Sequence, residues 1–274
     1  MSTNHKLFSG KTLAEISSLL RYQVIQMCHD SKSAHLGSSL SCIDILSTLY
    51  FQVLNVKADM PNWSERDIFI LSKGHAAMAL YATLAAKGYF PYAWLKQYKQ
   101  DGSVLAEHPP ATGVAGVEAA TGSLGHGLPI ATGEALAITM RQQNRRVFCL
   151  ISDGETNEGS VWEAALFAGA HRLSNLIVFL DYNKWQATGR SDEVLNITAH
   201  ENKWRAFGWD VEMINGHDFE QIVAASQNYS SKPKLIIADT IKGKGVSFME
   251  DDNNWHYRFP NYEEVQIARE ELGI

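Results

Sequence analysis

The sequence is poor in cysteine and has no apolar run long enough to cross a membrane. Its 274 residues include three cysteines, Cys28, Cys42 and Cys149, and no two of them form a CxxC pair. This pattern argues against a disulfide framework or a zinc site and predicts reduced thiols in a cytoplasmic protein. The segment from Met1 to Lys11 is polar, so we expect no secretory signal, and no apolar stretch approaches the roughly 20 residues of a membrane span.

Positive charge is also sparse. The chain has 24 Lys and Arg against 30 Asp and Glu, a formal net charge of −6, and no Lys/Arg-rich run. A weakly acidic chain has no electrostatic reason to bind nucleic acid or an anionic membrane. The content of 45% hydrophobic and 20% charged residues is typical of a globular protein with a substantial core.

The chain shows no internal repeat, no low-complexity tract and no Pro/Gly/Ser-rich linker, so we predict a single domain over residues 1–274. Apolar spacing distinguishes helical segments from short, continuously apolar strands. The predicted strands cover residues 67–71, 147–152, 176–180, 209–214 and 235–239, and the predicted helices cover residues 12–30, 39–53, 76–86, 130–141, 161–171, 201–207 and 219–227.

The alternation of strands and helices predicts the fold class. Strands that are apolar on both faces and alternate with helices favour an α/β fold, with a parallel β-sheet sandwiched by helices. In such sheets, ligands bind beyond the carboxyl ends of the strands. The residues that follow each strand are therefore the candidates for chemistry.

Two of the predicted strands lead into hard oxygen donors. Asp153 follows residues 147–152, and Asn183 follows residues 176–180. The separation of 183 − 153 = 30 residues fits one strand–helix–strand crossover, which predicts that the two strands are neighbours. A carboxylate and an amide oxygen at adjacent strand ends suit Mg²⁺ or Ca²⁺, which takes its other ligands from phosphate and water. Each residue alone is more typical of a turn or cap, so the hypothesis depends on the spacing.

Asp153-Gly154 with Asn183 at this spacing resembles the diphosphate-binding motif of thiamine diphosphate enzymes. The flanking segments resemble the transketolase family more narrowly, in the same order and over about residues 23–260. These segments are Ser33-Ala34-His35-Leu36-Gly37, Leu71-Ser72-Lys73-Gly74-His75-Ala76, Glu107-His108-Pro109, the Gly-rich turn Thr121-Gly122-Ser123-Leu124-Gly125-His126-Gly127, Glu158-Gly159, Lys242-Gly243-Lys244-Gly245-Val246-Ser247-Phe248 and Trp255-His256.

The resemblance implies a thiamine diphosphate-binding fold, specifically its diphosphate-binding domain, and a bound metal ion. The ion would be Mg²⁺, with Ca²⁺ or Mn²⁺ as alternatives. Its implied ligands are Asp153, the side chain of Asn183 and the backbone carbonyl of Trp185. Gly154 would let the diphosphate approach the backbone closely.

The resemblance also assigns roles around the cofactor and the substrate. His75 and His256 would donate hydrogen bonds to the diphosphate, and His256 would also face the substrate. The implied substrate contacts are His35 and His108, because histidine can pass protons near neutral pH. Gly122 and Leu124 would lie against the aminopyrimidine, and Glu158 would join an acidic network between paired sites. The remaining histidines are interpreted as surface or capping residues, among them His5, His29, His171, His200 and His217.

In the family, a glutamate that acts on the aminopyrimidine lies in a following pyrimidine-binding domain. The sequence stops at Ile274 without such a domain. We therefore expect a second subunit that carries this domain and the catalytic glutamate, as in split two-chain transketolases, with a heterotetramer as the assembly. The implied reaction transfers a two-carbon ketol unit from a ketose to an aldose, on sugars or sugar phosphates.

Three departures from the family pattern leave the substrate open. Ser152 stands where glycine is usual, His126 stands where Gln is more common, and Arg258 follows the substrate histidine. Arg258 is either a contact for an anionic sugar or an exposed loop cation, and the Lys242 to Lys244 segment is alternatively a solvated loop. Two other functions are retained: the alpha-type subunit of a 2-oxoacid decarboxylating or acyloin-forming enzyme, and a non-catalytic regulatory partner.

Overall fold

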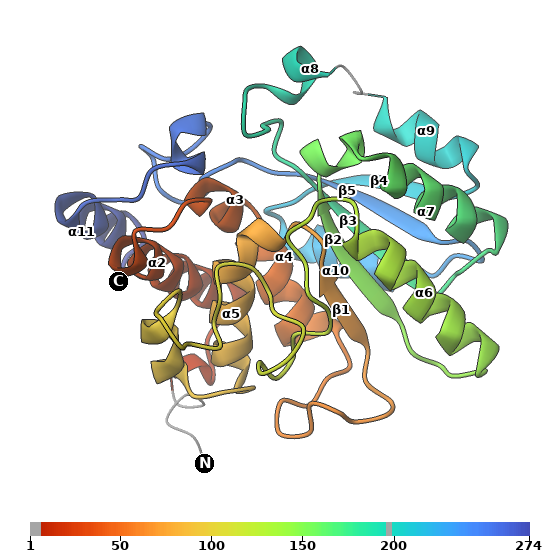
Figure 1. The fold of residues 1–274 in the computed structure, drawn as a ribbon, viewed down its shortest axis with the longest axis horizontal. Coiled ribbons are helices and arrows are strands. Elements are labelled where there is room, and N and C mark those ends of the chain that lie inside the picture. Colours follow the sequence, from red (N-terminus) through yellow and green to blue (C-terminus); the bar gives the residue numbers. More distant parts are fainter. Residues whose placement is uncertain (1–6, 196–198) are drawn as a thin grey trace.

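The computed structural model describes residues 7–195 and 199–274, and it is built on one five-stranded sheet (Figure 1). The strand order is β1-β2-β3-β5-β4, and every neighbouring pair is parallel. The predicted parallel α/β sheet is confirmed. The strands are β1 (Ile68–Leu71), β2 (Val147–Ser152), β3 (Leu176–Tyr182), β4 (Asp210–Asn215) and β5 (Lys234–Asp239).

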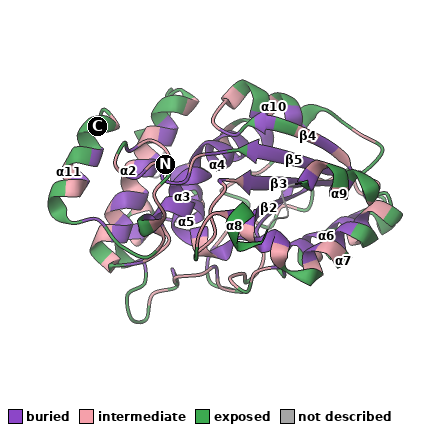
Figure 2. Ribbon diagram, turned by 90° about the horizontal axis from the view of Figure 1, so that it is seen from above, coloured by how far each residue is buried: buried purple, intermediate pink, exposed green. Residues whose placement is uncertain are grey.

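Alternate strand residues point into two separate cores, one on each face of the sheet. Phe148 and Leu150 of β2 face one core, whereas Cys149 and Ile151 face the other. This period of two is the expected geometry of a strand that is buried on both faces. Figure 2 shows the burial of the strands between helices whose outer faces are exposed. The first core is covered by α2 (Leu13–Ser31), α4 (Ile43–Thr48), α5 (Ala77–Lys87), α10 (Phe219–Gln227) and α11 (Tyr262–Glu271), and the second by α6 (Gly127–Met140), α7 (Gly159–Ala170) and α9 (His200–Ala206).

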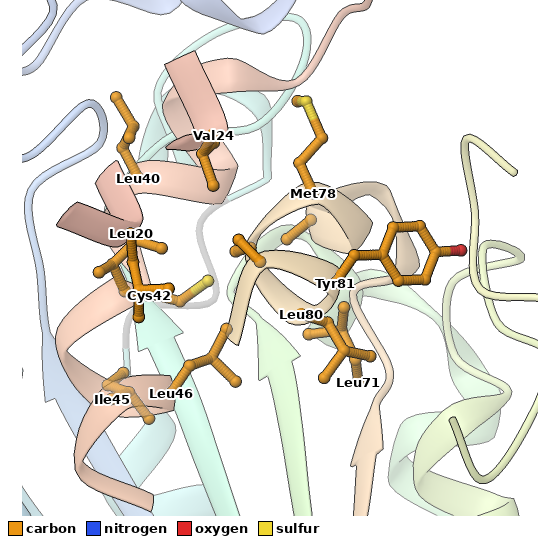
Figure 3. Packing of buried hydrophobic residues seen from close by; sticks show 14 of the residues in the cluster. Leu20, Val24, Leu40, Cys42, Ile45, Leu46, Leu71, Met78, Leu80 and Tyr81 are labelled. Carbon is orange, nitrogen blue, oxygen red and sulfur yellow. The ribbon is translucent and has the colours of Figure 1, made fainter. Parts of the chain in front are cut away.

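The helix α2 begins with a capping box, in which Thr12 and Glu15 each accept a hydrogen bond from the other's backbone N–H. Such a box satisfies donors that the first turn leaves unpaired and typically stabilises a helix by ~1 kcal/mol. Its apolar face enters the first core. Figure 3 shows Leu20 and Val24 of α2 in this core, which also contains Leu46 of α4 and Leu80 of α5.

The helix predicted over residues 39–53 is wrong as a single element. The structure has α3 (Leu36–Ser41), then α4, then one π-helical turn, η1 (Leu49–Val53), with a break at Cys42. The hydroxyl of Ser41 donates to the carbonyl of Ser38, and the thiol of Cys42 contacts the same carbonyl. These side chains compete with the helical hydrogen bonds, which favours a break.

Several elements escaped the sequence analysis, and all of them except α11 have six residues or fewer, too few to show an apolar repeat. In the described part of the chain, the structure adds α8 (Ser191–Val194), α11 and the 3-10 turns η2 (Gly74–Ala76), η3 (Tyr92–Gln97), η4 (Gly154–Asn157) and η5 (Asn253–His256). Of these, η2, η4 and η5 carry residues of the candidate site. The search for a helix long and apolar enough to span a membrane finds none in residues 7–195 and 199–274.

Candidate functional site

Asp153 and Asn183 lie at the carboxyl ends of neighbouring strands, as their spacing predicts. In the register of β2 and β3, Ser152 is opposite Asp181, so Asp153 follows β2 one residue beyond this pair and Asn183 follows β3 two residues beyond it. Both side chains are buried, with 1% and 3% of their surface exposed. Asp153 accepts hydrogen bonds at 2.8 Å from the backbone N–H of Gly154 and from the hydroxyl of Ser191.

Within residues 7–195 and 199–274, the hydrogen-bond partners of Asp153 include no positively charged group. Burial is the main cause that raises the pKa of this carboxyl to about 6, with a further rise from Asp181, although the Ser191 hydroxyl opposes it. A buried carboxylate in this state favours a cation beside it. In the described residues no three His, Cys, Asp or Glu side chains are grouped for a metal ion. The carboxylate of Asp153 and the amide oxygen of Asn183 are themselves donors that suit a hard ion whose other ligands are outside oxygens.

Trp185, the third expected metal ligand, lies in the loop after Asn183, and its N–H donates to the Asn183 side-chain oxygen at 3.1 Å. Its indole N–H donates to Asp251 at 2.8 Å, and the guanidinium of Arg190 lies 3.8 Å from its ring centroid. Arg190 also forms two hydrogen bonds with Asp251. These contacts fix the loop on which the Trp185 carbonyl is carried.

Four histidines from four separate segments meet at the same end of the sheet. The ring of His35 lies 5.5 Å from His75, 6.0 Å from His108 and 5.0 Å from His256, measured between centroids. His35 has a left-handed backbone with φ of 69° at the start of α3, which turns its ring into the cluster. Its Nδ1 atom is buried without a hydrogen-bond partner. An unpaired imidazole nitrogen in this position is a candidate contact for a bound polar molecule.

Three of these histidines, His35, His75 and His256, are uncharged at neutral pH because their pKa values are lowered. Burial lowers the pKa of His35 to about 4, with a smaller contribution from His108, and burial with Lys242 lowers the pKa of His256 to about 3. The pKa of His75 lies well below its ordinary value, again chiefly through burial and then through Lys73. Each neutral ring offers one N–H donor and one acceptor, which suits contacts with hydroxyl and phosphate groups.

A fully buried ion pair lies beneath the site, and the sequence analysis missed it. Lys73 and Asp181 are both 0% exposed and are paired with each other. Lys73 also donates to the carbonyl of Ser38 at 2.8 Å, while Asp181 accepts from Ser41 at 2.6 Å and from Thr240. Burial opposes ionisation of both groups, yet their attraction raises the pKa of Lys73 and lowers that of Asp181. Both therefore carry charge at neutral pH.

Lys242 was expected to be either a family residue or part of a solvated loop, and the solvated alternative is wrong for this residue. Its side chain is 0% exposed, whereas the side chain of Lys244 is 31% exposed. The Lys242 ammonium donates to Asn253 at 2.6 Å and lies 3.2 Å from Nδ1 of His256. Burial is the main cause that lowers its pKa to about 8, although Asp153 opposes the shift.

The Gly-rich turn packs against the histidines. Gly122 has a φ of 142°, and a Cβ there would lie 2.8 Å from the His108 ring, so only glycine fits. Leu124 is half-buried, and the N–H of Gly125 donates to the carboxylate of Glu155 at 2.8 Å. Glu155 also accepts from the hydroxyl of Ser72. The buried acid that holds the Gly-rich turn is thus Glu155 of η4, a residue that the sequence analysis did not select.

The remaining predicted positions differ in exposure. Glu158 is exposed and precedes α7, where its Cβ would contact any side chain placed at Gly125. Gly154 is half-buried, and a Cβ there would lie 3.1 Å from the side chain of Gln186. Arg258 is exposed, is paired with Glu264 and lies over the Trp255 ring at 4.2 Å. Arg258 is therefore an exposed cation that is paired within its own segment, and both interpretations of its role stay open.

The histidines interpreted as surface or capping residues are only partly so. His171 is exposed, and His29 is half-buried and contacts the carbonyl of Pro260 at 2.8 Å. The interpretation is wrong for His200, which is 4% exposed, and for His217, which is bonded to buried Asp44. His5 lies outside the described residues.

The family model and the relatives that match this chain all point to one family. The family model described as "Transketolase, thiamine diphosphate binding domain" matches residues 13–274. An apulose-4-phosphate transketolase subunit of Phocaeicola vulgatus is 38% identical over 266 residues, which cover 96% of this chain and 94% of that protein. The 6-deoxy-6-sulfo-D-fructose transketolase subunit SqwG of a Clostridium species is 45% identical over 219 residues, or 79% and 80% of the two chains.

Solved structures agree with this result. The transketolase of Campylobacter jejuni superposes with a TM-score of 0.90 at 33% identity, and that of Leishmania mexicana with 0.90 at 28%. Each match covers 96% of this chain but only 43% and 41% of the respective transketolase. The chain thus spans less than half the length of these solved relatives.

Proposed function

The chain belongs to the transketolase family, and from this premise we propose that it forms the thiamine diphosphate half of a two-chain transferase. The enzyme moves a two-carbon ketol unit from a ketose to an aldose acceptor. The observation that carries the proposal is that a pair of oxygen donors and a cluster of histidines lie at the same end of the sheet. Asp153 and Asn183 provide hard oxygen donors, and four histidines surround the adjoining space.

The cofactor's diphosphate would be held at the strand ends. Mg²⁺ would bind Asp153, Asn183 and the carbonyl of Trp185, and Ca²⁺ or Mn²⁺ could replace it. Gly154 would admit the diphosphate close to the backbone. Two N–H groups would face it from His75 and His256, and the ammonium of Lys242, 3.2 Å from His256, adds positive charge on the same side.

Thiamine diphosphate, when bound, supplies an electron sink for cleaving a carbon–carbon bond beside a carbonyl. The chain's own residues would orient the reactants. His35, His108 and His256 would each present a ring nitrogen that can accept a hydrogen bond from one sugar hydroxyl or donate one to another. Gly122 and Leu124 would pack on the aminopyrimidine. Exposed Glu158, at the start of α7, would meet an acidic group where two chains are in contact.

The second subunit would supply the pyrimidine-binding domain and the catalytic glutamate. Support comes from the relatives named as subunits, two of which match this chain over 94% and 93% of their own length. We assign the complex to a heterotetramer in the cytoplasm, where free buried thiols such as those of Cys28, Cys42 and Cys149 persist.

The substrates would be sugars or sugar phosphates. The relatives' names specify an apulose phosphate and a sulfonated fructose, both of which are ketoses with an anionic group. The competing 2-oxoacid reaction handles fewer hydroxyl groups than the histidine cluster can contact. Incubation of both subunits with a ketose phosphate or with pyruvate decides between them, because only one should be consumed.

Calorimetric titration of the two-chain complex with thiamine diphosphate and Mg²⁺ tests the site. Asp153→Ala should abolish metal-dependent binding without unfolding the chain, because it removes the ion's carboxylate ligand. Asp101→Ala, at an exposed position far along the chain, serves as the matched control. Retained affinity in Asp153→Ala would contradict the site assignment, and no binding by the wild-type complex would favour the regulatory alternative.

A further inference from the structure

A further buried carboxylate, Asp44 of α4, lies outside the proposed cofactor site and joins three segments. Its side chain is 5% exposed, is paired with Arg21 of α2 and accepts from Nδ1 of His217 at 2.8 Å. Burial alone would raise the pKa of Asp44, but Arg21 and His217 together lower it to about 2. The carboxylate is thus charged, and its Oδ2 atom contacts both Arg21 and His217, although the proposed chemistry does not use it.

His217 connects Asp44 to the backbone near the site through a second hydrogen bond. Its Nε2 accepts a hydrogen bond from the backbone N–H of Ile241 at 2.9 Å. A backbone N–H can only donate, so Nε2 carries the lone pair and Nδ1 carries the proton that Asp44 accepts. The ring therefore connects α4 to the residue that directly precedes Lys242.

The same segment is held at two further points. Nε of Arg21 donates to the carbonyl of Lys244 at 2.9 Å, and the N–H of Gly243 donates to the carbonyl of Gly37 at 3.0 Å. A Cβ at Gly245 would lie 2.6 Å from the Arg21 side chain, so glycine is what permits this approach. Residues 241–245 consequently have little freedom, and the buried ammonium of Lys242 has a fixed origin.

We propose that His217 is a positioning residue for Lys242, which it serves by fixing the backbone of Ile241 against Asp44. The role rests on the proposed function, because it requires that Lys242 face the cofactor's diphosphate. His217 itself is separated from that group by the backbone that it holds. Its loss should displace the ammonium and weaken cofactor binding without removing any group that contacts the cofactor.

Hydrogen–deuterium exchange of the full chain without cofactor tests the positioning step. His217→Ala frees the Ile241 N–H, so exchange in peptides covering residues 241–250 should accelerate by about fivefold, the effect of losing one hydrogen bond. His217→Gln, which retains one donor and one acceptor, should restore part of the protection. The exposed His171→Ala is the matched control and should leave this segment unchanged. Unchanged exchange at 241–250, or an equal increase throughout the chain, would overturn the proposal.

A double-mutant cycle in the two-chain complex tests the link to Lys242. His217→Ala should raise the half-saturating thiamine diphosphate concentration roughly tenfold, the usual effect of losing a residue that orients a binding group. In a Lys242→Ala background, the same substitution should have no further effect. A tenfold increase in both backgrounds would show that His217 acts elsewhere. Failure of the wild-type complex to bind thiamine diphosphate would count against the proposed function, whereas the exchange experiment would still decide the positioning.

Discussion

Removing one member of the buried Lys73–Asp181 pair should destabilise the protein far more than removing both. Both side chains are 0% exposed. Lys73→Met leaves the Asp181 carboxylate in the core with hydroxyl and amide partners only, and Asp181→Asn leaves an ammonium with the Ser38 carbonyl. An uncompensated buried charge costs about 3–5 kcal/mol of unfolding free energy.

The double variant Lys73→Met/Asp181→Asn contains neither charge, so it should lose less stability than either single variant. Urea unfolding followed by tryptophan fluorescence measures all three free energies. The exposed pair of Glu201 and Arg205 on α9 is the control, because Glu201→Gln should change stability by less than ~0.5 kcal/mol. A double variant as unstable as the sum of the two single variants would refute the coupling on which the reasoning depends.

Three further predictions follow from the pKa shifts and the contacts of the site. The folded-state pKa values of about 4 for His35 and about 3 for His256 lie below the ordinary 6.5. Their contribution to stability is therefore present above pH 6.5 and is lost as the pH falls toward these values. Each histidine should lower the free energy of unfolding by up to ~1.4 kcal/mol for each pH unit. A urea midpoint that is constant from pH 7 to 5 would contradict this prediction. Protonation of Asp153, whose pKa is about 6, competes with metal binding. The Mg²⁺ affinity measured by titration should therefore fall about tenfold for each pH unit below pH 6. An affinity that does not change with pH would exclude this carboxylate as the ligand. Glu155→Ala leaves the N–H of Gly125 without its acceptor, so it should cost ~1–3 kcal/mol in urea unfolding and weaken cofactor binding, whereas the exposed Glu163→Ala should do neither.

The sequence predicted the strands well because their apolar runs are bounded by polar turns. The β2 strand and the α10 helix were predicted with their observed bounds, and the strand preceding Asn183 was two residues short. That β2 and β3 are neighbours was predictable because one crossover has a narrow range of lengths. The histidine cluster was available only through the family resemblance, since its members come from four distant segments.

Other parts of the site lay beyond a one-dimensional pattern. Lys73 and Asp181 are 108 residues apart, and each is of a type that is usually exposed, so nothing local marks them as a buried pair. The break at Cys42 depends on hydroxyl and thiol contacts with the Ser38 carbonyl. His217 was interpreted as a surface residue because its only local signal is a turn, whereas its partner Asp44 is 173 residues away.

Because the residues of the site are spread along the chain, ligand binding at the site requires the whole chain to be folded. Its first and last histidines are separated by 256 − 35 = 221 residues, and the carboxylate at 153 lies between them. No contiguous fragment of moderate length contains the whole set, so a nascent or nicked polypeptide has no partial version of the pocket to fill. A molecule that binds at the site therefore stabilises only the fully folded chain. It should raise the free energy of unfolding of the entire fold, not of one part of it.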